Sequence, residues 1–336
     1  MDDAAPNPSF DRHGPAKPQS PVILSVPHAG RDYPPALIEA LGVPFEQLLP
    51  LEDRYVDRVA ILARRHETLF VARRPRAWID LNRGEQERDP AVDLGADAKG
   101  QPGASSKLRG GLGLIPRRAS GATLLWRRQF SGAEVEARIA QDHRPYHAAL
   151  AAALRSARDV FGRSVLLDIH SMPSIETPDP ARIVIGDRFG RSASAATVAL
   201  VESVVRSHGV RFGLNSPYAG GHILDTHGNP TRGIDAIQIE IDRTLYLDAE
   251  LDQPGAGLAA TAGLLRSIAA AVADEITALP NSHKKTTPCK MHEVAKVQGG
   301  DTPEGVSRDP AKGGDTGTAH NQYRQAATGF KGFSTT

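Results

Sequence analysis

His28 and His170 each follow an apolar run of the sequence that is typical of a strand, and Asn82 and Arg83 follow a third such run. Open α/β sheets bind ligands at the carboxyl ends of their strands. An imidazole at a rigid strand end can coordinate a metal through one nitrogen while the other nitrogen keeps an orienting partner. The two histidines are therefore candidate metal ligands. The alternative is that they are strand-end residues whose nitrogens are bound by the backbone.

A third ligand is expected from a nearby group of carboxylates. A catalytic zinc site typically uses three protein ligands, often two histidines and one carboxylate, and keeps an open position for water. Glu52 and Asp53, with Asp57 one helical turn beyond, are the candidates. The alternative is that the acidic pair caps a helix, because carboxylates stabilise helix N-termini.

Glu240 is a candidate general base. It stands in the alternating segment 237–241, which places Gln238 and Glu240 on the same face of a strand. Apolar surroundings would raise the pKa of this carboxyl and suit it to proton transfer. The alternative is an outward-facing residue paired with Arg243. Arg83 is a candidate for bidentate binding of a substrate carboxylate.

His143 and His147 have the i, i+4 spacing of a helical zinc pair, but the residues between them are Arg-Pro-Tyr. The glutamate of the HExxH motif is absent, and Pro145 is expected to distort the turn. We therefore predict a supporting role for His147 and a surface position for His143. The glycine-rich stretches 110–113 and 220–222 lack the context that phosphate binding requires, which argues against a nucleotide site.

Strands alternate with helical patterns along the middle of the chain, which is typical of an α/β fold. Several of the expected strands are apolar on both faces, as in a sheet covered by helices on each side. The expected strands are Val22–Val26, Thr68–Ala72, Ala77–Leu81, Ser164–Ile169, Arg182–Ile185 and Ala236–Ile241, and helices are expected at about 52–66, 131–159, 191–208 and 256–279.

The remaining segments set the expected domain boundaries. Residues 1–20 contain four prolines and are predicted to be a disordered leader. Residues 281–336 are polar, rich in Gly, Thr, Lys and Asp, and are predicted to be a disordered tail. A single catalytic domain is expected over 21–280. Within it, the glycine- and charge-rich segment 84–121 is long for a connection, and we expect a lid over the site.

Composition argues against several classes of function. The 336 residues include 40 Lys and Arg against 39 Asp and Glu, so the net charge of +1 gives no case for nucleic-acid or anionic-membrane binding. No apolar run approaches the ~20 residues of a membrane span. The N-terminus lacks the features of a secretory signal, and the single cysteine, Cys289, allows no intrachain disulfide and no thiolate zinc cage. We expect a cytoplasmic protein. Its oligomeric state is left open.

Eight short blocks lie in order across roughly 21–275. They are SVPHAG (25–30), EDRYVDR (52–58), RAWIDLNR (76–83), GLGLIPRR (111–118), RPYH (144–147), DIHSMP (168–173), NSPYAGGHI (215–223) and QIEIDRTLY (238–246). Together these blocks resemble the N-formylglutamate amidohydrolase family. The block containing DLNR is also similar to a segment of aspartoacylases and succinylglutamate desuccinylases, zinc amidohydrolases related to zinc carboxypeptidases.

This resemblance implies a three-layer α/β/α sandwich with a mixed central sheet, of the phosphorylase/hydrolase-like type, and one Zn²⁺ per chain. By position, His28 and His170 match the two metal histidines of the family. Glu240 matches the glutamate that activates water. Asn82 and Arg83 match the pair that grips the substrate carboxylate.

One departure affects the third ligand. The related carboxypeptidase-type site carries HxxE, whereas the residue three positions after His28 is Arg31. The carboxylate ligand must therefore come from elsewhere. We choose Asp53, with Glu52 and Asp57 as rivals.

The reaction that the resemblance implies is hydrolysis of N-formyl-L-glutamate, or a similar N-acyl acidic amino acid, to the amino acid and formate. This is a step of amino-acid catabolism such as histidine degradation. Arg243 or an arginine of the lid is expected to hold the second carboxylate. One alternative is a zinc amidase or carboxypeptidase acting on a peptide or cell-wall amide. A different class of answer is a catalytically inactive ligand-binding protein with the same fold.

Overall fold

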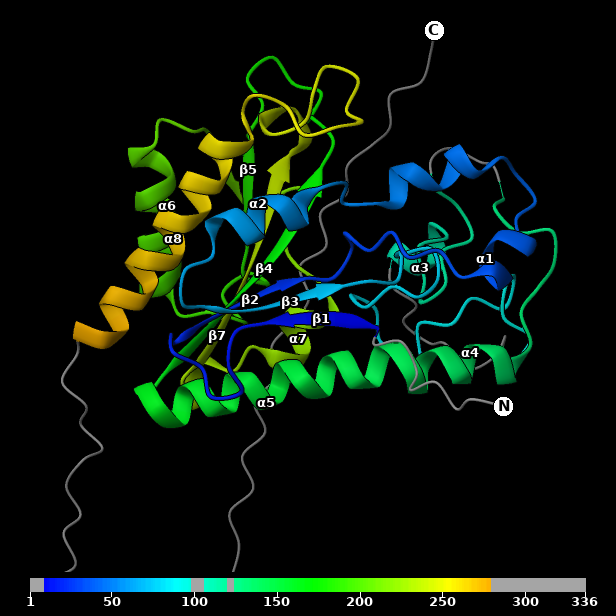
Figure 1. Ribbon diagram of the computed structural model, residues 1–336, viewed down its shortest axis with the longest axis horizontal. Coiled ribbons are helices and arrows are strands. Elements are labelled where there is room, and N and C mark those ends of the chain that lie inside the picture. The colour runs from blue at the N-terminus through cyan, green and yellow to red at the C-terminus, as the bar shows by residue number, and fades with distance from the viewer. Residues whose placement is uncertain (1–8, 98–105, 120–123, 279–336) are drawn as a thin grey trace, which may run out of the picture. The chain divides into compact units, whose positions relative to one another are not determined.

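A seven-stranded mixed sheet forms the centre of the computed structural model, which describes residues 9–97, 106–119 and 124–278 (Figure 1). The strand order is β1-β3-β2-β4-β7-β5-β6. Strands β3, β2, β4 and β7 run parallel, while β1 and β5 are antiparallel to β3 and β7. The strands are β1 Phe10–His13, β2 Val22–Val26, β3 Thr68–Ala72, β4 Ser164–Met172, β5 Ile183–Gly186, β6 Phe212–Leu214 and β7 Ile234–Asp242.

Helices cover both faces of this sheet, so the expected three-layer α/β/α sandwich is confirmed (Figure 1). In β2, Val22 and Leu24 pack in one layer and Ile23 in the other, because successive strand side chains point to opposite faces. One layer contains α2 (Val56–Ala63), α6 (Ala195–Ser207) and α8 (Leu258–Ala278), and the other contains α4 (Gly132–Arg138), α5 (Arg144–Phe161) and α7 (His222–His227).

A third, smaller apolar cluster lies outside these two layers. Leu37, Leu48 and Leu125 are among its fully buried members. The cluster is built from α1 (Pro35–Glu39), the 3₁₀ helix η1 (Phe45–Leu51) and the connections near residues 77 and 125. The short helix α3 (Ser106–Arg109) belongs to the connection that we expected to form a lid.

The expected strand Ala77–Leu81 is wrong. The segment is buried, but it forms turns in which the Trp78 amide donates to the Pro75 carbonyl at 2.8 Å. The Asp80 carboxylate accepts from the Asn82 amide at 2.9 Å. A side chain that binds its own backbone in this way competes with strand pairing.

The prediction of a disordered leader over residues 1–20 is wrong for its second half, because Phe10–His13 form β1 against β3. The edge strand β6 was also missed, since it has only three residues and its middle one is a glycine. Strands β2 and β3 match their expected bounds, whereas β4 and β7 extend further than expected. The tail at 281–336 lies outside the described residues. No helix among the described residues is long and apolar enough to cross a membrane.

The long helix expected at 131–159 contains a change of helix type. A π-helical turn, η2 (Ile139–His143), separates α4 from α5, and Pro145 follows in the first turn of α5. Proline lacks the N–H that would continue the regular pattern of helical hydrogen bonds, so the expected distortion is confirmed. The surface position expected for His143 is wrong, because the π-helical turn directs this residue inward and leaves it 2% exposed.

Candidate active site

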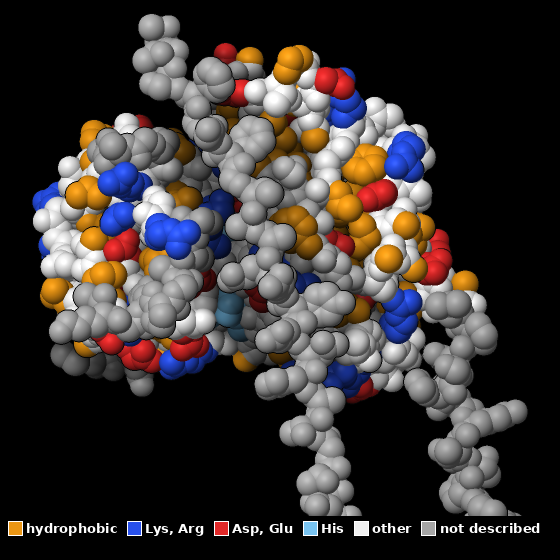
Figure 2. Space-filling view, turned by 180° about the vertical axis from the view of Figure 1, so that it is seen from behind, with side chains coloured by type: hydrophobic (Ala, Val, Ile, Leu, Met, Phe, Trp, Pro, Cys, Tyr) orange, Lys and Arg blue, Asp and Glu red, His pale blue; other side chains and the backbone are white. Residues whose placement is uncertain are grey.

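A cavity of about 670 Å³ lies at the carboxyl ends of β2, β4 and β7. His28, His170 and Glu240 line it, together with side chains from the segment expected to be a lid. In Figure 2, histidine side chains are visible in a hollow of the molecule, beside acidic and basic side chains. Residues 98–105 and 120–121 of the expected lid lie outside the described part of the chain, and the movement of the lid stays a prediction.

His28, Asp53 and His170 meet in this cavity. One oxygen of the Asp53 carboxylate, Oδ2, lies 3.0 Å from His170 Nδ1 and 3.5 Å from His28 Nδ1. The two imidazole rings are 4.7 Å apart between centroids. All three side chains are buried, and one ligand atom from each lies within 4.8 Å of the other two. The structure therefore brings together the three residues predicted to bind the metal.

A carboxylate orients each of these histidines from behind. His28 Nε2 lies 2.7 Å from Asp80 Oδ1, and His170 Nε2 lies 2.8 Å from Asp168 Oδ2. Histidine ligands of metals commonly donate their second ring N–H to a carboxylate, which fixes the tautomer and the ring orientation. Both aspartates belong to segments already singled out, Asp80-Leu81-Asn82 and Asp168-Ile169-His170. The Asp-x-His spacing in the second of them was an unused signal.

The donor set fits a divalent metal such as Zn²⁺. His28 Nδ1 is buried and makes no hydrogen bond within the described part of the chain. Burial alone would lower the pKa of His170, but Asp168 and Asp53 raise it well above its usual value. Burial would likewise raise the pKa of Asp53, but the hydrogen bond with His170 and the proximity of both imidazoles lower it below its usual range. The pocket thus favours a positive charge between these side chains.

The rival carboxylates have other partners. Glu52 accepts a short hydrogen bond from the Tyr33 hydroxyl and forms an ion pair with Arg54 at 3.0 Å. Asp57 forms a bidentate pair with Arg31, at 2.8 and 3.1 Å. The arginine that departs from the HxxE pattern therefore binds one of the rivals. Asp53 is the candidate whose carboxylate faces both histidines.

Backbone contacts place Asp53 beside the end of β2. The Asp53 amide donates to the His28 carbonyl at 3.0 Å. Gly30 allows the chain after β2 to lie close to the segment after β3, since a Cβ there would meet the Arg74 carbonyl oxygen at 2.1 Å. The site thus depends on backbone approach as well as on side-chain chemistry.

Glu240 enters the site through the pairing of β4 with β7. The register sets His170 opposite Glu240, so strand pairing alone brings these two positions together. Glu240 is 7% exposed, which makes the outward-facing alternative wrong. Burial raises its pKa to about 7, and Gln238 Nε2 donates to Glu240 Oε1 at 2.9 Å. A carboxyl with this pKa can take up and release a proton near neutral pH.

The candidate substrate-binding residues line the same cavity. Arg83 Nε donates to the Leu112 carbonyl at 2.8 Å, and its burial lowers the pKa of the guanidinium. Asn82 Oδ1 accepts from the Ile223 amide at 2.9 Å. Arg243 donates through Nε to Ser171 Oγ at 3.1 Å and lies 3.7 Å from Asp53.

Two further cations, Arg76 and Lys107, line the cavity. Arg76 Nε lies 2.8 Å from Asp80 Oδ2, behind His28. Lys107 comes from α3, and burial with Arg83 and Arg76 nearby lowers the pKa of its ammonium group. A single sequence does not distinguish such residues from other surface cations, because only the fold brings them to the cavity.

Comparison with known proteins gives consistent results. Residues 20–247 match the family model described as N-formylglutamate amidohydrolase. An N-formylglutamate deformylase of Pseudomonas putida is 28% identical over 239 residues, which cover 68% of this chain and 82% of that protein. The crystal structure of an N-formylglutamate amidohydrolase from Ralstonia eutropha JMP134 is 33% identical, with a TM-score of 0.74, over 80% of this chain and 99% of that one. A structure from Agrobacterium tumefaciens, 20% identical with a TM-score of 0.53, covers 80% of this chain and 96% of its own and shares the fold.

Proposed function

Since the chain belongs to the N-formylglutamate amidohydrolase family and is a hydrolase that acts on an amide, we propose that it cleaves N-formyl-L-glutamate. Water adds across the formamide bond, and the products are formate and L-glutamate. The observation that carries the proposal is the meeting of His28, Asp53 and His170 beside a buried glutamate in a cation-lined cavity. Release of glutamate suits a cytoplasmic enzyme of amino-acid catabolism, including histidine degradation.

The metal in this proposal is one Zn²⁺, held by His28, Asp53 and His170. When bound, zinc supplies Lewis acidity, which lowers the pKa of water and polarises an amide carbonyl. Asp80 and Asp168 keep the two imidazoles in the required orientation through their Nε2 atoms.

Glu240 is the proposed carrier of the proton. Its carboxylate takes a proton from the attacking water and gives it to the nitrogen of the leaving glutamate. A group with a pKa of about 7 can perform both transfers at neutral pH, because neither protonation state is strongly disfavoured. The Gln238 amide donates to one of its oxygens, which holds the side chain in place.

Arginines and an asparagine are proposed to bind the two carboxylates of the substrate. Arg83 and Asn82 hold the α-carboxylate, and Arg243 holds the side-chain carboxylate. The cavity lining supports this assignment, since all three side chains face the same space as the two histidines. Fixing both carboxylates would keep the formamide group near Glu240 and reduce the entropic cost of reaction.

A substrate panel tests the proposal. Zinc-loaded protein should release formate from N-formyl-L-glutamate, with a higher kcat/KM than for N-formyl-L-norvaline, which lacks the side-chain carboxylate, and for N-acetyl-L-glutamate, which has a larger acyl group. Release of formate and of free amino acid should be measured separately. Absence of formate release from every N-formyl amino acid would overturn the proposal and favour a peptide amide or a binding function.

A further inference from the structure

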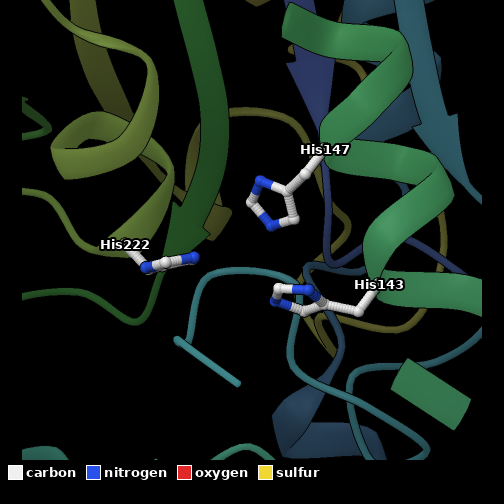
Figure 3. A group of neighbouring side chains, drawn as sticks. All are labelled: His143, His147 and His222. Atoms are coloured by element: carbon white, nitrogen blue, oxygen red, sulfur yellow. The ribbon is translucent and has the colours of Figure 1, made fainter. Parts of the chain in front are cut away.

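A second group of histidines lies beside the first cavity. His143 and His147 come from the π-helical turn and the first turns of α5, and His222 comes from the start of α7 (Figure 3). The ring centroids are 4.3 Å apart for His143 and His147, 5.1 Å for His147 and His222, and 5.7 Å for His143 and His222. One nitrogen from each ring lies within 4.8 Å of the other two.

His143 has the hydrogen-bonding pattern of a metal-ligating histidine. Its Nε2–H donates to the Arg83 carbonyl at 2.7 Å, which leaves a lone pair on Nδ1. Nδ1 is buried and has no hydrogen-bond partner among the residues that the structure describes. Its nearest carboxylate contact is Glu85 Oε1 at 3.9 Å. A buried nitrogen that lacks a donor is costly, and a cation at this place would satisfy it.

His147 and His222 complete the group, but they differ in the hydrogen bonds that each would lose on binding a metal. His147 contacts the Leu81 carbonyl through Nε2 and His227 Nε2 through Nδ1, both at 2.9 Å. One of these two partners must be exchanged for the metal. His222 is half-buried, and its contacts to Thr226 Oγ1 are long, at 3.2 and 3.4 Å, so its nitrogens are readily available.

The surroundings allow an ion to enter. All three histidines line a cavity of about 380 Å³, shared with Glu85, Arg144 and others. The charge of Arg144 is already paired with Glu85 at 2.7 Å and with Glu136 at 2.9 Å. Burial lowers the pKa of each of the three imidazoles, and neighbouring rings add to this effect at His147 and His222, so all are neutral and able to ligate at pH 7.

We propose that His143, His147 and His222 form a second metal site, for a divalent transition-metal ion such as Zn²⁺. Three imidazoles without a carboxylate suit zinc, nickel or copper, and do not suit Mg²⁺ or Ca²⁺, which prefer oxygen ligands. The site lies behind the segment that carries Asn82, because His143 and His147 bind the carbonyls on either side of that residue. A bound ion would therefore stiffen the segment proposed to hold the substrate.

Zinc stoichiometry tests this site independently of hydrolysis. The parent for the test is the full-length chain carrying His28→Ala and His170→Ala, which removes the proposed catalytic site. Equilibrium dialysis against Zn²⁺ should show one more bound ion per chain in this parent than in the same chain with His222→Ala added. The polar tail is present in every variant, so any ion that it binds cancels in the comparison.

Two further variants complete the design. His143→Gln keeps a donor for the Arg83 carbonyl but removes the ligand nitrogen, and it should lose the same ion. His208→Ala removes an exposed histidine at the end of α6, which packs on the other face of the sheet, and should lose none. Circular dichroism verifies that each variant is folded, and His143→Gln replaces His222→Ala if the latter is not. Equal zinc in the parent and in the folded ligand variants, or no zinc in the parent, would overturn the proposal.

Discussion

The two histidine groups of this chain differ in what stands behind the imidazoles. In the first, His28 and His170 face the carboxylates of Asp80 and Asp168. In the second, His143 and His147 face backbone carbonyls. Both groups are largely buried, and both offer three ligand atoms in close proximity. The difference is therefore one of charge rather than of geometry.

That difference sets the protonation of the rings. Burial lowers the pKa of His170, but carboxylates more than compensate and raise it well above its usual value. Burial and the adjacent histidines lower the pKa of His147 to about 2. The first group favours a positive charge, whether that of a proton or of a metal ion. Beside the second, Glu85 lies 3.9 Å from His143 Nδ1 and is already paired with Arg144. We accordingly expect tighter zinc binding at the first group.

The largest effect should come from the acid that only the first group has. Glu240→Gln should lower kcat by about 10²–10⁴-fold, because the amide cannot accept the proton of the attacking water. Zinc content should be unchanged, since Glu240 is not among the proposed ligands. The control is Glu250→Gln, which alters an exposed glutamate. Wild-type turnover in Glu240→Gln would contradict the general-base role that distinguishes the first group from the second.

The pH profile offers a second way to test the electrostatics of the first group. With a pKa of about 7, the carboxylate fraction of Glu240 falls about fifty-fold between pH 7 and pH 5, and kcat/KM should fall with it. A bound dication stabilises the carboxylate, so the midpoint of this acid limb should lie at or below pH 7. Stopped assays in overlapping buffers measure the profile. A kcat/KM that rises as the pH is lowered would contradict the general-base role.

The orienting carboxylates can be removed, whereas backbone carbonyls cannot. Asp168→Asn keeps the size of the side chain and its contact with Ser25 Oγ but removes the charge behind His170. Zinc affinity at the first group should fall about 10–100-fold. Competition with a fluorescent zinc chelator measures the change. Unchanged affinity would mean that carboxylates do not distinguish the first group from the second.

The smallest effect should come from a rival of the third ligand. Asp57→Asn weakens the pair with Arg31 and should cost about 1 kcal/mol of folding free energy, with zinc content unchanged. Asp53→Asn, the matched variant, should lose the zinc. Urea unfolding and elemental analysis measure the two properties. Loss of zinc in Asp57→Asn but not in Asp53→Asn would mean that Asp57, and not Asp53, is the third metal ligand of the first group.

Local patterns were sufficient for β2, β3, β4, β5 and β7 and for several site residues, but not for the edge strands β1 and β6. β2 and β3 have the expected bounds because a short run that is buried on both faces has a clear signature in composition. His28, His170 and Glu240 could be singled out because each stands in or directly after such a run. Their chemistry depends on the residue type and on a position at the end of a strand, and both can be identified from the sequence.

Residues that act through partners distant in sequence could not be assigned in this way. Asp80 orients His28 across 52 positions, and Arg31 binds Asp57 across 26. The segment 77–81 resembled a strand because all its residues except Asp80 are apolar, yet backbone hydrogen bonds and the Asp80 side chain fold it into turns. Pairing of this kind depends on which loops meet at the sheet edge.

The sequence by itself determined the fold class, the family and the identity of the main candidate ligands, because strand periodicity and ordered motifs are local properties. Only the tertiary structure decided which carboxylate faces the two histidines, and only it placed His143 inside the protein beside His147 and His222. The physical reason is that charge pairing and burial act through space. They depend on contacts between segments that the backbone brings together, and such contacts have no fixed spacing along the chain.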